Sequence, residues 1–144
     1  MKHPRLVAGL WFAAAGALLP ALWFLPSAMH RHWTLWFLYL ALPGIAAGIS
    51  GSLLGHRILD ARWRGGGWRA ALRGTLVALV AFAIFAPCFA AVYALTELPE
   101  AHVNVFGLAM AVLGVGLLMT GVMTLPLGGL CGWLLYLVVR RRGG

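Results

Sequence analysis

Apolar residues run along this chain in four long segments, separated by short polar stretches. The segments cover residues 6–25, 33–54, 74–96 and 103–139, and none of them contains Asp, Glu, Lys, Arg or His. A helix needs about 20 residues to cross roughly 30 Å of hydrocarbon. The pattern therefore predicts an all-α fold, a polytopic integral membrane protein whose single domain is a bundle of four transmembrane helices.

The fourth segment is longer than one upright crossing requires. Its 37 residues, 103–139, would make a helix of about 55 Å. We predict one long helix, kinked near Pro126, because the proline ring removes a backbone donor and clashes with the preceding turn. Two short crossings with a turn near residues 119–121 are the alternative.

Charge placement favours the first of these two topologies. With four crossings, ten of the eleven Lys and Arg residues fall on one side of the membrane, and only Arg31 falls on the other. Five crossings would move the last three arginines to the opposite side. Short cytoplasmic loops collect Lys and Arg, so both termini and the basic loop 55–73 are predicted to be cytoplasmic, in an inner or plasma membrane. The ten residues are Lys2, Arg5, Arg57, Arg62, Arg64, Arg69, Arg73, Arg140, Arg141 and Arg142.

Composition agrees with a lipid environment. Hydrophobic residues make up 62% of the chain and charged residues 10%, against roughly a quarter charged in soluble domains. A net charge of +8 is also typical of nucleic-acid binding, but here the cations lie only at the ends of apolar segments. No nucleic-acid partner is therefore expected.

The basic loop is the main candidate site. Its arginines lie beside two tryptophans, a combination that suits anionic lipid headgroups or a protein partner as well as orienting the chain. His56 and Asp60 with these arginines would also suit an enzyme acting on lipid headgroups, although Asp60 has the spacing to pair with Arg57 or Arg64 instead. The residues predicted to bind lipid or a partner are Arg57, Arg62, Trp63, Arg64, Trp68, Arg69 and Arg73.

Small residues recur at every fourth position of the apolar segments. Such rows let membrane helices approach closely. The second segment carries Gly44, Gly48, Gly51 and Gly55, which are predicted to contact another helix of the same chain or of a second copy. Further rows are Gly9, Ala13, Ala17 and Ala21 in the first segment, Ala86, Ala90 and Ala94 in the third, and Gly116, Thr120, Thr124, Gly128 and Gly132 in the fourth.

Candidate chemistry is sparse elsewhere. Cys88 and Cys131 form no CxxC pair, and we expect them to remain unbridged. His30, His32 and His102 are weak metal candidates whose spacing matches no known ligand pattern, so neither a metal nor a cofactor is predicted. The Ser and Thr hydroxyls within the segments are expected to bond to carbonyls of their own helices.

Function follows from these absences by elimination. Proton-coupled carriers usually keep an ionisable group inside the membrane, and none lies within the apolar segments. We therefore expect a small noncatalytic membrane protein, an accessory or assembly subunit that packs against a membrane partner or against itself. The alternatives are an oligomeric channel or carrier for small solutes, and a lipid-headgroup enzyme.

Overall fold

The computed structural model describes residues 3–28, 40–59, 66–97 and 104–142, and these are almost entirely helical. The α-helices are α1 (Pro4–Ala28), α3 (Leu42–Leu54), α4 (Gly67–Glu97) and α5 (Val105–Arg142), and a 3-10 helix, η2 (Gly55–Leu59), follows α3 directly. The described residues contain no strand. The all-helical prediction is confirmed for this part of the chain.

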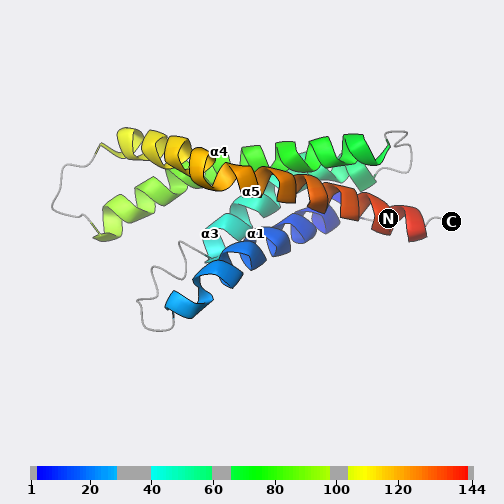
Figure 1. The fold of residues 1–144 in the computed structure, drawn as a ribbon, viewed down its shortest axis with the longest axis horizontal. Helices are drawn as coiled ribbons and strands as arrows, with labels where there is room; N and C mark the ends of the chain where they lie inside the picture. Colours follow the sequence, from blue (N-terminus) through cyan, green and yellow to red (C-terminus); the bar gives the residue numbers. More distant parts are fainter. Residues whose placement is uncertain (1–2, 29–39, 60–65, 98–103, 143–144) are drawn as a thin grey trace.

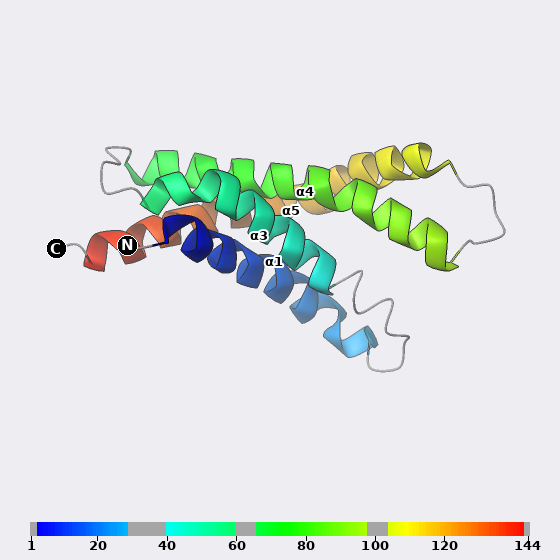
Figure 2. The ribbon, with the colours of Figure 1, turned by 180° about the vertical axis from the view of Figure 1, so that it is seen from behind.

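The helices form two antiparallel pairs. α1 packs mainly against α3, α4 packs mainly against α5, and contacts between α3 and α4 join the two pairs. α1 begins and α5 ends at the same end of the molecule, where α3 gives way to η2 and α4 begins (Figure 1). At the opposite end the α1–α3 pair spreads away from the α4–α5 pair (Figure 2).

Helix boundaries differ from the apolar segments chiefly around the basic loop. The α-helix ends at Leu54, the chain continues as 3-10 helix to Leu59, and α4 begins at Gly67 rather than at Gly74. Arginine and alanine favour helix, so α4 continues past its apolar part into the charged residues. Trp68, Arg69 and Arg73 therefore lie on the first turns of α4, not in a loop.

The last apolar segment forms one helix. α5 runs without interruption through Pro126 to Arg142, and it does not reverse at residues 119–121 (Figure 1). α4 contains a second internal proline, Pro87, and changes direction part-way along its length (Figure 2). A proline inside a helix removes one backbone hydrogen bond, which accounts for such a bend.

Two stretches, Gly67–Thr96 and Gly121–Arg141, are long and apolar enough to span a membrane, and 17% of an 18-residue apolar window in each is buried within the chain. Pro4–Leu18 and Val105–Leu118 are shorter apolar stretches of the described chain.

The buried core lies near the end where α1 begins and α5 ends. It joins side chains from α1, η2, α4 and α5, so this end ties the two helix pairs together. The core residues are Ala8, Phe12, Ile58, Leu59, Ala70, Val77 and Leu135.

Candidate functional site

The glycine row of α3 lies against α1 of the same chain. A methyl group added at Gly44 would lie 3.2 Å from Cβ of Ala17, and one added at Gly48 would lie 3.1 Å from Cβ of Ala13. Farther along, methyl groups at Gly51 and Gly55 would come within 2.7 and 2.8 Å of atoms of Phe12. Of the two partners considered for this row, the structure thus shows an intramolecular one, and the helices approach to backbone contact.

The α4–α5 pair is closer still at its basic end. A methyl group at Gly74 would strike the Gly128 carbonyl, and one at Gly128 would lie 2.6 Å from Cβ of Ala78. Gly132 faces the backbone of α4 at Ala70 in the same way. Toward the other end the ring of Phe82 fills the space against Gly116, so the two backbones stand farther apart there.

Hydroxyl groups in the helices donate to nearby carbonyls of their own helix, as expected. Ser50 donates to Ala46 O at 2.8 Å, and Thr75 Oγ1 lies 3.2 Å from Ala71 O and 3.3 Å from Leu125 O on α5. These bonds satisfy the hydroxyls in surroundings that offer little water.

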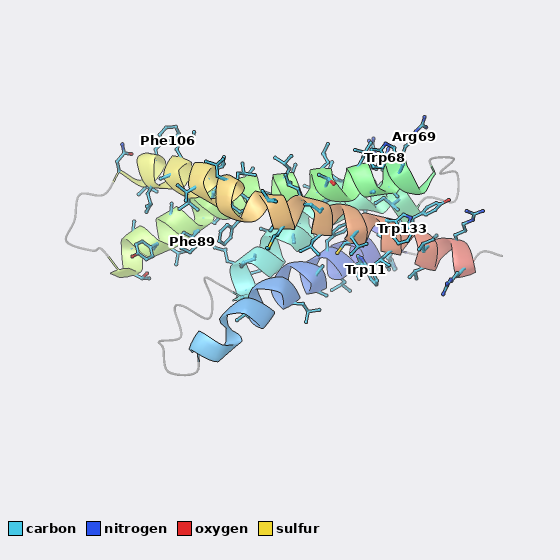
Figure 3. The ribbon with its side chains drawn as sticks, in the orientation of Figure 1. Trp11, Trp68, Arg69, Phe89, Phe106 and Trp133 are labelled. Atoms are coloured by element: carbon cyan, nitrogen blue, oxygen red, sulfur yellow. The ribbon has the colours of Figure 1, made fainter. Side chains whose placement is uncertain are left out.

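Trp11 connects the two helix pairs. Its indole Nε1–H donates to the backbone oxygen of Cys131 at 3.2 Å, and Figure 3 shows Trp11 and Trp133 at the same end of the molecule. The pattern of aromatic residues gave no reason for a tryptophan one turn inside the membrane boundary. A hydrogen-bond acceptor on α5 supplies the reason, because an indole N–H among apolar residues needs a partner.

The described cations gather at one end of the molecule. Arg5 begins α1, Arg57 lies on η2, Arg69 and Arg73 lie on the first turns of α4, and Arg140 and Arg141 lie on the last turn of α5. Trp68 is exposed beside Arg69 on the outer side of α4 (Figure 3). Of the residues predicted to bind lipid or a partner, Arg62, Trp63 and Arg64 lie outside the described residues, as does Asp60.

Arg57 and Arg73 influence each other electrostatically. Arg73 immediately precedes the uncharged part of α4, and the charge of Arg57 acts on it. Like charges disfavour the charged form of each other, so an anion near both would relieve the repulsion.

An open cleft of about 340 Å³ lies at the same end. The cleft is lined by His3, by the first residues of α1 and by His56 of η2. The imidazole of His56 has its Nδ1 3.0 Å from the Ser52 carbonyl, to which a protonated Nδ1 donates. The hydrophobic and polar patterns gave no signal for this cleft, because it joins residues from two distant segments. The lining residues are His3, Pro4, Arg5, Leu6 and His56.

The structure describes both cysteines, but it does not describe the three histidines considered as metal candidates. Cys88 and Cys131 are both free thiols in the structure. Among the described residues no three His, Cys, Asp or Glu side chains gather into a possible metal site. His30, His32 and His102 lie outside the described residues.

Comparison with protein-family models, with curated proteins and with solved structures finds no match to this chain.

Proposed function

We propose that this chain is a four-span protein of the inner or plasma membrane with both termini in the cytoplasm, acting as a noncatalytic accessory or assembly subunit. Its partner is another membrane protein or a second copy of the chain, and anionic lipids contact its basic end. The observation that carries the proposal is that the described helices face apolar residues outward while the described cations gather at one end.

The outward-facing residues suit lipid rather than water. Leu118 and Val122 on α5 are 79% and 78% exposed, and Leu95 on α4 is 78% exposed. A helix in the core of a soluble protein would bury most such residues, whereas 17% of the 18-residue apolar window in each membrane-length stretch is buried here. Soluble monomers rarely expose such extended apolar surfaces.

The distribution of charge supports the orientation. The described Arg residues lie where α1 begins, where η2 and α4 meet, and where α5 ends. In a membrane, a basic end of this kind faces the cytoplasm.

The interior supports a packing role over transport or catalysis. The apolar segments carry no Asp, Glu, Lys, Arg or His, and Ser50, Ser52 and Thr75 donate to backbone carbonyls of their own helices. The helices pack closely against one another and present apolar side chains outward. Association of membrane helices depends on surfaces of this kind.

We predict opposite labelling of the two ends of the molecule. Single cysteines at Gly66 and at Asn104, in a background with Cys88 and Cys131 changed to Ala, should react differently with an impermeant maleimide added outside intact cells. Asn104→Cys should label and Gly66→Cys should label only after the membrane is opened. Labelling of Gly66→Cys from outside would contradict the cytoplasmic assignment.

We also predict that the protein works as part of an assembly. After extraction in a mild detergent, native mass spectrometry should find the chain in a complex whose protein mass is at least twice the 15.4 kDa of the chain. Purified chain in liposomes should neither pass small solutes nor alter phospholipids. A monomeric particle would argue against the proposal, and solute flux or lipid turnover would favour one of its alternatives.

A further inference from the structure

We infer that the cleft between the start of α1 and η2 binds a phosphate group, either that of an anionic lipid headgroup or a free phosphate. The inference rests on the proposed membrane orientation for the lipid source, because the cleft lies at the end assigned to the cytoplasmic surface. It goes beyond that proposal by naming a site outside the arginines and tryptophans of the predicted loop.

The side chains of the cleft match the chemistry of phosphate. Arg5 presents a planar fork of N–H donors that binds phosphate in a bidentate manner, and His3 and His56 add imidazole groups. With Nδ1–H donated to Ser52 O, Nε2 of His56 can donate to a phosphate oxygen when it also carries a proton. Among the residues that the structure describes, no carboxylate lines the cleft.

Local charge favours an anion here. The first turn of α1 contains no acidic residue, so the protein does not compensate the positive end of that helix. The whole chain has three Asp and Glu residues against eleven Lys and Arg residues. Asp60 is the only one of the three in the basic half of the predicted topology, so most of the charge at this end must be balanced from outside the chain.

The volume and position of the cleft fit the phosphate of a lipid headgroup and a free phosphate alike. A volume of about 340 Å³ falls at the lower end of the range for small-molecule sites, roughly 300–1,000 Å³. Leu6, which also lines the cleft, is 60% exposed and lies on the apolar part of α1. A lipid could thus place its phosphate among the basic side chains and its acyl chains along α1.

The test compares Arg5→Gln/His56→Gln with Arg141→Gln. Both variants remove one arginine charge from the same end, but Arg141 does not line the cleft. In nanodiscs of phosphatidylcholine with phosphatidylglycerol, the double variant should bind phosphatidylglycerol about tenfold more weakly, measured by native mass spectrometry, because it loses both the Arg5 fork and the His56 imidazole that would contact the phosphate. Arg141→Gln should change binding less than about twofold, because its side chain does not line the cleft and an exposed charge acts at a distance only through the salt-screened field.

Titration with inorganic phosphate in phosphatidylcholine nanodiscs separates the two sources. Binding that the double variant loses identifies a site open to free phosphate, and loss of phosphatidylglycerol binding alone identifies a lipid site. Equal loss in both variants, or loss in neither, overturns the inference.

His3→Gln and Arg5→Lys guard against misfolding of the double variant. Each should weaken binding while leaving the helical circular dichroism spectrum unchanged, and retention of full binding by both would also overturn it. Labelling of Gly66→Cys on these variants reports orientation separately, so a wrong topology and an absent site give different results.

Discussion

Gly74→Leu should destabilise the protein more than any other single change at the glycines of the α4–α5 interface. The first carbon of the new side chain would strike the Gly128 carbonyl, and it would lie 2.9 Å from Cα of Gly132. Both neighbours are backbone, so no side chain can rotate to make room. Overpacking typically costs 1–3 kcal/mol, and here the helices themselves must separate, so we expect a loss of more than about 3 kcal/mol in the free energy of unfolding.

Gly114→Leu is the matched control for this experiment. It adds the same side chain to α5, but no atom lies within 4 Å of the position where its Cβ would be. Reversible unfolding in detergent and denaturant should show a change within about 0.5 kcal/mol for the control. Similar losses in the two variants would mean that α4 and α5 do not meet at Gly74.

Residue patterns predict the helices better than they predict helix pairing. Runs of apolar residues give α1 and α5 within about three residues at each end, because a helix must satisfy its own backbone in an apolar medium. The same runs are apolar on every side, so they contain no stripe that marks the inward face. Small residues at fourth positions indicate close approach, as Gly48 does, but they do not say that its neighbour is Ala13.

Changes of helix type are still harder to predict. No residue pattern predicts that the α-helix tightens to a 3-10 helix at Gly55, which is buried beneath the ring of Phe12. That change depends on a neighbour more than 40 positions earlier in the chain. Pro87 is different, because an internal proline is expected to bend a helix. The apolar residues on both sides of it nevertheless read as one continuous segment.

For the candidate site, too, the sequence predicts the type of residue but not the spatial arrangement. Its charge is visible in the sequence, since arginines cluster at the ends of apolar segments. Its geometry is not, because Arg5 and His56 come together only when α1 packs against α3 and η2. A pattern within one segment reports which groups lie at the membrane surface, whereas a binding site requires knowing which segments are neighbours.

Phe12→Ala should have the second large effect, and it tests the contact that organises the basic end. The side chain is 4% exposed and belongs to the core that joins α1, η2, α4 and α5. Its ring occupies the space left by the absent side chains of Gly51 and Gly55, with Cε2 2.8 Å from where a methyl group at Gly55 would lie. Truncation leaves a cavity against backbone that cannot collapse without moving a helix. We expect a loss of about 3–5 kcal/mol in the free energy of unfolding.

Phe106→Ala on α5 provides the comparison, because it removes the same atoms from a side chain that is 74% exposed. Its unfolding free energy should stay within about 0.5 kcal/mol of the original protein. A loss in Phe12→Ala no greater than in Phe106→Ala would show that the ring is not enclosed. If Phe12→Ala loses stability and also loses phosphate binding in nanodiscs while remaining helical, the ring also sets the position of η2, and with it His56, beside the start of α1.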